Sequence, residues 1–160
     1  MEEYGRHLII DLTVTDANVE GLRDRDLCAQ YLDLIVELIG MQPVFPTIAM
    51  KFPFSNETCG LVKKLEVEGI KSEVLAEYSE YVKNKDDDKT GISAFSVLTT
   101  SHASIHTWPE KNYASIDIYS CLNFDNKTVE DFTIKYFNSK EIRVKNILRH
   151  HSKHQIIEEY

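Results

Sequence analysis

The stretch GISAFSVLTTSHASIHTWPEKNYASIDIYSC, residues 91–121, decides the fold. It contains three runs rich in β-branched and apolar side chains, at 91–100, 102–108 and 112–121, and this composition is typical of strands. Residues 109–111, Pro-Glu-Lys, fit a tight connection between the second run and the third. The spacing therefore predicts a meander of three consecutive antiparallel strands.

Polar and apolar side chains alternate along the second and third of these strands. Within 113–121 one face is aliphatic, and the other carries polar or aromatic residues: Tyr113, Ser115, Asp117, Tyr119 and Cys121. The same period places His106 on a polar face of 102–108. Two neighbouring strands could therefore bring His106 and Cys121 near a common site.

The segments around the meander supply further strands and two helices. Residues 6–14 and 141–148 have strand composition, and 43–54 is an edge or irregular strand because it contains prolines. Apolar residues at three- and four-residue steps predict helices over 24–39 and 125–139. The order β-α-β, meander, α-β predicts an α+β fold, a two-layer sandwich with a mainly antiparallel sheet and its helices on one face.

A chain of 160 residues fits one domain that buries a core without disulfides or metals. We expect this domain to comprise residues 1–148, with a variable insertion at about 55–90 and a polar C-terminal tail at 149–160. The tail holds His150 and His154 at a helical i, i+4 spacing that suits zinc, but it offers no third ligand nearby. We interpret it as solvated and expect no metal site.

Charge and cysteine content exclude several classes of protein. The net charge of −8 repels nucleic acid and anionic lipid, and the apolar run near the N-terminus is too short to span a bilayer. The three cysteines are odd in number and irregularly spaced, which argues against a disulfide framework and a CxxC metal site. We expect a cytoplasmic protein without a nucleic-acid or membrane partner.

The segment SHASIHTWPEKNYASIDIYSC, residues 101–121, carries a family resemblance. Preceded by GISAF and by an N-terminal GRHLIIDL, it resembles the prokaryotic S-adenosylmethionine decarboxylase proenzymes, whose hallmark is close to ESHxSIHTxPExxYxxxDxxxC. The resemblance covers the first strand, the first helix, the meander and the second helix, and leaves out mainly residues 50–90 and the tail.

The resemblance implies a chain that cuts itself at the bond Thr100-Ser101. The Ser101 hydroxyl would attack the preceding carbonyl to give an ester, and β-elimination followed by hydrolysis would leave a pyruvoyl group in place of Ser101. That ketone would form a Schiff base with the amine of S-adenosylmethionine and accept the electrons freed as carbon dioxide leaves, so pyridoxal phosphate would not be needed. The product is the aminopropyl donor for spermidine synthesis.

The same resemblance implies roles for further residues. Ser93 and His106 are similar to the processing helpers, and Cys121 resembles the acid that returns a proton to the decarboxylated carbon. Glu110 matches the glutamate that binds ribose hydroxyls. Trp108 is a candidate aromatic face for adenine or the sulfonium group. A phenylalanine of KFPF, Phe52 or Phe54, is another. The family also implies a homodimer of cleaved protomers.

Two departures from the family pattern leave other functions open. Thr100 stands where the family usually has glutamate, and Ala94 where it usually has glycine. A non-processing homologue that binds an adenosyl ligand or regulates an active partner is one alternative. A pyruvoyl-dependent decarboxylase of ornithine or arginine, with residues 50–90 forming a different pocket, is another. Without the motif, His106 and Cys121 would be ordinary half-buried or core residues.

Strand parity adds a geometric expectation about Ser101. If the strand runs straight, Ser101 lies on the face opposite His106. Either a bulge at 101–103 re-aims the serine, or the cleaved terminus swings toward His106 and Cys121.

Overall fold

The computed structural model describes residues 3–52, 90–150 and 156–159. Its strands are β1 (Glu3–Thr13), β2 (Ile48–Phe52), β3 (Gly91–Val97), β4 (His102–Trp108), β5 (Tyr113–Ser120), β6 (Glu141–His150) and β7 (Ile156–Glu159). Its α-helices are α1 (Glu20–Arg23), α2 (Arg25–Leu38) and α5 (Asn126–Phe137), and its 3-10 turns are η1 (Asp16–Asn18) and η3 (Pro109–Lys111). No helix in these ranges is long and apolar enough to cross a membrane.

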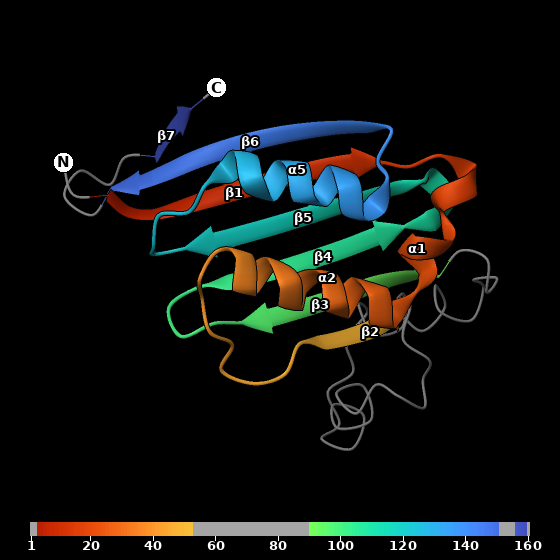
Figure 1. Ribbon diagram of the computed structural model, residues 1–160, viewed down its shortest axis with the longest axis horizontal. Helices are drawn as coiled ribbons and strands as arrows, with labels where there is room; N and C mark the ends of the chain where they lie inside the picture. Colours follow the sequence, from red (N-terminus) through yellow and green to blue (C-terminus); the bar gives the residue numbers. More distant parts are fainter. Residues whose placement is uncertain (1–2, 53–89, 151–155, 160) are drawn as a thin grey trace, which may run out of the picture.

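The described strands form one antiparallel sheet in the order β2-β3-β4-β5-β1-β6-β7. β1 lies inside the sheet because it pairs with both β5 and β6, although its paired residues are at least 100 positions away in the sequence. Figure 1 shows α2 and α5 side by side across one face of the sheet. The predicted two-layer α+β sandwich is confirmed.

The core lies between the sheet and these helices. Alternate strand residues point into it, among them Leu8, Ile10, Ile105 and Ile116, all fully buried. Tyr31 of α2 is buried too, and its hydroxyl shares a 2.7 Å hydrogen bond with Thr133 of α5. Burial raises the pKa of Tyr31, so this pair holds the two helices together in the neutral form.

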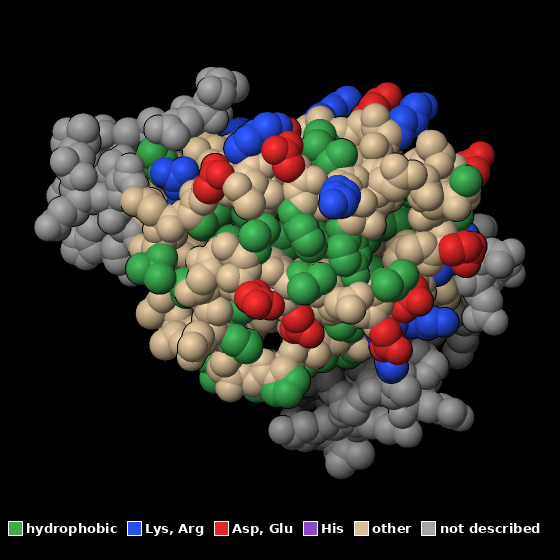
Figure 2. Space-filling model, viewed as in Figure 1, with side chains coloured by type: hydrophobic (Ala, Val, Ile, Leu, Met, Phe, Trp, Pro, Cys, Tyr) green, Lys and Arg blue, Asp and Glu red, His purple; other side chains and the backbone are tan. Residues whose placement is uncertain are grey.

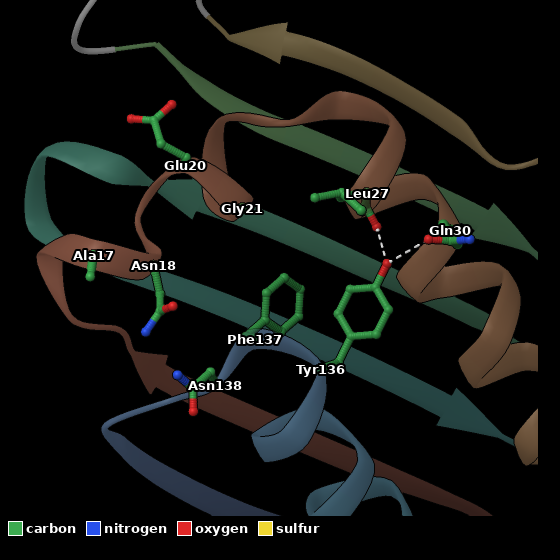
Figure 3. Close-up of a pocket in the computed structure, with 9 residues that line it drawn as sticks. All are labelled: Ala17, Asn18, Glu20, Gly21, Leu27, Gln30, Tyr136, Phe137 and Asn138. Carbon is green, nitrogen blue, oxygen red and sulfur yellow. Dashed lines mark hydrogen bonds between the residues drawn. The ribbon is translucent and has the colours of Figure 1, made fainter.

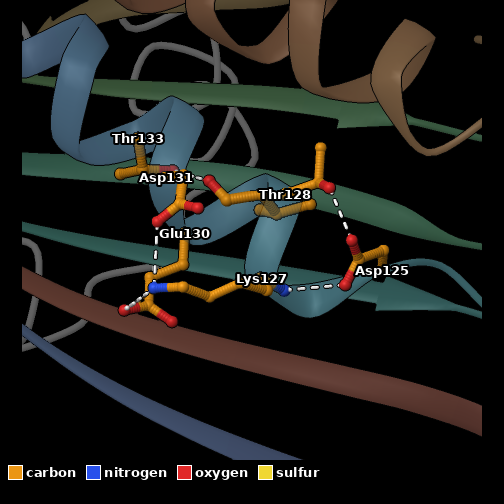
Figure 4. Close-up of polar contacts among 7 residues, drawn as sticks. Asp125, Lys127, Thr128, Glu130, Asp131 and Thr133 are labelled. Carbon is orange, nitrogen blue, oxygen red and sulfur yellow. Dashed lines mark hydrogen bonds and ion pairs between the residues drawn. The ribbon is translucent and has the colours of Figure 1, made fainter.

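Both long helices have side-chain caps at their N-termini. The Asp24 carboxylate accepts hydrogen bonds from the backbone N–H groups of Asp26 and Leu27 at 2.8 and 3.0 Å. Asp125 accepts the backbone N–H of Lys127 at 3.1 Å at the start of α5 (Figure 4). These caps fix the helix starts close to the positions that periodicity predicts.

The strands of the meander pair regularly, and their register tests the expected bulge at 101–103. The pairing of β3 with β4 runs without a shift from Ser93↔His106 to Val97↔His102. Leu98 and Ser101 then close a two-residue turn through backbone hydrogen bonds of 3.0 and 3.5 Å. The structure therefore contains no bulge at 101–103, and Ser101 directly precedes β4 at the end of the sheet.

Two local expectations differ from the structure. The tail was expected to be polar and outside the domain, but 156–159 pair with β6 as β7, because Ile156 and Ile157 supply strand residues at an open sheet edge. His150 ends β6. His154 and the insertion at 55–89 lie outside the described residues.

Candidate active site

The face of the sheet without helices carries the polar residues of the meander. Register places them on this face in four strands: His7 on β1, Ser93 on β3, His102 and His106 on β4, and Asp117 and Tyr119 on β5. The predicted polar faces of 102–108 and 113–121 are therefore one continuous surface, which we call the open face. Its edge near β2 is apolar, with Ile48, Met50 and Phe95 each more than 40% exposed.

Ser101 and Cys121 meet at one end of this surface, beside the turn between β3 and β4. The backbone N–H of Cys121 donates to Ser101 Oγ at 3.1 Å. The Cys121 thiol donates to the carbonyl oxygen of Thr100, also at 3.1 Å. Ser101 is only 8% exposed. A serine hydroxyl, the carbonyl before it and a hydrogen-bond donor to that carbonyl are thus assembled at one peptide bond.

Ser93 and His106 meet farther along the meander, on directly paired positions of β3 and β4. His106 Nδ1 lies 3.0 Å from Ser93 Oγ. Burial lowers the pKa of His106, and the negative charge of Asp117 opposes that shift only in part. The imidazole is therefore held neutral, the form that can accept a proton.

Within one chain, the pair of Ser101 and Cys121 lies far from the pair of Ser93 and His106. Five positions of extended strand separate Ser101 from His106, about 16 Å at about 3.3 Å per residue. His106 is paired with Ser115, six positions before Cys121. The expectation that His106 and Cys121 share a site is therefore wrong within one chain, because strand parity puts both on one face but says nothing of distance along it.

The predicted substrate-binding residues lie beyond His106, away from Ser101. Trp108 ends β4 and packs on Tyr113 with ring centroids 5.4 Å apart. Glu110 is exposed in η3, which joins β4 to β5. Phe52 is the last residue of β2, and Phe54 lies outside the described residues.

The two departures from the family pattern lie at different places in the meander. The Thr100 side chain is exposed in the two-residue turn. Ala94 is fully buried on the helix-covered face, opposite to Ser93. Its methyl therefore does not lie beside the Ser93 hydroxyl, contrary to what adjacency in the sequence suggests.

A cluster that sequence reasoning missed lies near the Ser101 end. One ligand atom from each of His7, His102 and Asp117 lies within 4.8 Å of the others, an arrangement that could hold a metal ion. However, an Arg149 nitrogen lies 3.2 Å from His7 Nδ1, and arginine only donates, so this nitrogen accepts. His7 Nε2 then carries the proton and donates to Asp117 at 2.7 Å.

The hydrogen bond from His7 is the main cause that holds the pKa of Asp117 below its ordinary value, against the opposing effect of burial. His102 Nε2 lies 3.5 Å from the same carboxylate oxygen. The cluster therefore works as a hydrogen-bonded chain from β6 through β1 and β5 to β4.

A cavity lies elsewhere, in the helix layer (Figure 3). It measures about 390 Å³ and is lined by Glu20, Leu27, Tyr136 and neighbouring residues of α1, α2 and α5. Figure 2 shows hydrophobic side chains between α2 and α5 on this side of the molecule. None of the predicted site residues lines the cavity, so the candidate site is on the other face of the sheet.

A family model matches most of the chain, and individual relatives match shorter segments. A family model described as S-adenosylmethionine decarboxylase matches residues 6–150. A proenzyme of that name from Thermococcus kodakarensis is 39% identical over 61 residues, 38% of this chain and 43% of that protein. Proenzyme 2 of Bacillus cereus is 35% identical over 69 residues, 42% and 56% of the two chains. The matched segments span about half the length of these relatives.

A crystal structure of the adenosylmethionine decarboxylase from Aquifex aeolicus has the same fold. It superposes with a TM-score of 0.56 at 20% identity, over 100% of this chain and 98% of that one.

Proposed function

Because the chain belongs to the S-adenosylmethionine decarboxylase family, we propose that it is a self-processing, pyruvoyl-dependent decarboxylase of S-adenosylmethionine that supplies the aminopropyl donor for spermidine synthesis. One observation carries the proposal: Cys121 donates its backbone N–H to Ser101 Oγ and its thiol to the Thr100 carbonyl oxygen, on the two sides of the peptide bond Thr100-Ser101. We place the enzyme in the cytoplasm, where Cys28 and Cys121 stay free thiols.

The contacts at Thr100 support self-cleavage. Attack of Ser101 Oγ on the Thr100 carbonyl carbon puts negative charge on the oxygen to which the Cys121 thiol already donates. Loss of the C–N bond leaves an ester between Thr100 and the Ser101 oxygen. A base then removes the Ser101 α-proton and the Thr100 carboxylate leaves. The remaining dehydroalanine takes up one water and releases ammonia, which yields the pyruvoyl group.

The neutral imidazole of His106 suits the role of that base, and its contact with Ser93 orients the ring. Once formed, the pyruvoyl group serves as an electron sink for decarboxylation. The Cys121 thiol then supplies the proton that the product carbon needs. Glu110 and Trp108 are the proposed contacts for ribose and adenine.

We propose that the site is completed in a homodimer of cleaved protomers. Ser101 and Cys121 lie at one end of the open face, whereas Ser93 and His106 lie farther along the same two strands. Two copies packed antiparallel through their open faces would place His106 of the partner subunit against Ser101. The exposed apolar side chains of Ile48, Met50 and Phe95 fit burial in such an interface.

Intact mass measurement with and without Ser101→Ala tests the proposal. The unaltered chain should give two fragments, 1–100 and 101–160, the second with a ketone-reactive N-terminus, and should release carbon dioxide from S-adenosylmethionine. A single uncut chain without a carbonyl would contradict the proposal. Faster release from ornithine or arginine would instead favour a change of substrate on the same fold.

A further inference from the structure

Tyr119 occupies a tightly enclosed position on the open face of β5. It is 8% exposed. On one side it packs against the backbone of Gly5, where an added Cβ would lie only 2.7 Å from the Tyr119 hydroxyl oxygen. Arg149 covers the ring, with its guanidinium carbon 4.6 Å from the ring centroid. The ring therefore has little freedom to move.

Two histidines complete this enclosure. The ring centroids of His7 and His102 lie 5.9 and 5.7 Å from that of Tyr119. Both histidines are held in turn by Asp117, which accepts from His7 at 2.7 Å and faces His102 at 3.5 Å. These contacts thus fix Tyr119 relative to His102, which follows Ser101 in the sequence.

The Tyr119 hydroxyl points at the Cys121 thiol. Tyr119 lies near the end of β5, Cys121 directly follows the strand, and Cys121 Sγ lies 3.6 Å from the Tyr119 oxygen. The other acceptor for this thiol is the carbonyl oxygen of Thr100. Cleavage at Thr100-Ser101 turns that carbonyl into the carboxylate of a free chain end, which is no longer bonded to Ser101. Tyr119 is then the partner that remains fixed in the strand.

We infer that Tyr119 is a positioning residue that orients the Cys121 thiol for proton transfer and stabilises the thiolate that forms. This rests on the proposed function, in which Cys121 is the acid. A hydroxyl both accepts and donates, so it accepts from the thiol before transfer and donates to the thiolate afterwards. The second bond is the stronger one because its acceptor is charged.

The variant Tyr119→Phe removes the hydroxyl and keeps the ring between Gly5 and Arg149. We expect the chain to be cleaved as before and kcat for S-adenosylmethionine to fall about tenfold, with KM nearly unchanged. Alkylation of Cys121 by iodoacetamide at neutral pH, followed by peptide mass spectrometry, should slow severalfold because the thiolate loses its donor. A structural role alone would not change that rate.

Tyr136→Phe is the matched control. It removes a hydroxyl that bonds Leu27 and Gln30 in the helix layer, far from the thiol, and should leave both readouts unchanged. Equal alkylation rates in Tyr119→Phe and the unaltered protein would overturn the inference, as would equal losses in both variants. Slower alkylation in Tyr119→Phe without turnover by the unaltered protein would support the pairing and contradict the proposed function.

Discussion

The two ends of the open face differ in what holds their reactive groups. At the Ser101 end, Cys121 bonds Ser101 Oγ and the Thr100 carbonyl, and the chain Arg149-His7-Asp117 reaches His102, the next residue. At the His106 end, the imidazole is held by Ser93 and by aromatic rings, with Phe95 and Trp108 about equally distant at 6.4 and 6.3 Å. In the proposed mechanism, the first end places a bond for cleavage, and the second keeps a base neutral.

Among the variants of the two ends, Ser101→Ala should have the largest effect on self-cleavage. Without the hydroxyl the chain cannot form the ester, so cleavage should be lost completely, as seen on a denaturing gel. Thr99→Ala, in the exposed turn next to the cleaved bond, is the control and should be cut normally. Cleavage of Ser101→Ala would show that another residue carries the reaction.

Mixed dimers test whether the two ends work across two chains. His106→Ala alone should cut at least about a hundredfold more slowly, because it lacks the base. Co-expressed with Ser101→Ala, its Ser101 would meet the intact His106 of the other chain, and cleavage of the His106→Ala chain should return. If it stays uncut in the mixture, the site is completed within one chain.

The pH dependence of cleavage should follow the protonation of His106. The base works in its neutral form, and burial lowers the pKa of His106 below its ordinary value. Cleavage should therefore persist as the pH falls through about 6.5 and decline only at lower pH. We would measure cleavage rates during refolding over a pH series. A midpoint above the ordinary histidine value would contradict the inferred burial effect.

Asp117→Asn should have the smallest effect and act at the Ser101 end. The folded-state pKa of Asp117 lies below the unfolded value. The carboxylate therefore adds stability above about pH 4, and that stability is lost as the pH falls through the folded-state pKa. Because the side chain is 36% exposed, we expect Tm to fall by only about 2–4 °C at neutral pH.

Thermal unfolding of Asp117→Asn at neutral and acidic pH measures this difference, with the exposed Asp131→Asn on α5 as a control. A loss that persists undiminished in acid would mean that the carboxylate charge is not its cause.

Local sequence patterns predicted most of the fold. The alternation around Ile105 and Ile116 marked the core face of the meander, and the apolar spacing marked α2 and α5. Sequence periodicity failed in segments that are too short to show it. The four-residue helix α1 spans only about one turn, too short for a repeating apolar pattern, and Ile156 and Ile157 became a strand only because the edge of β6 was free to pair.

The sequence by itself determined the family and the parity of the meander strands, and it supplied Ser101 as the residue proposed at the cleaved bond. Only the tertiary structure decided which groups meet, because those contacts join strands that are distant in the chain. His7 and Asp117 are 110 residues apart, and Arg149 and His7 are 142 apart. Periodicity assigns a side chain to a face, whereas register between distant strands decides its neighbours there.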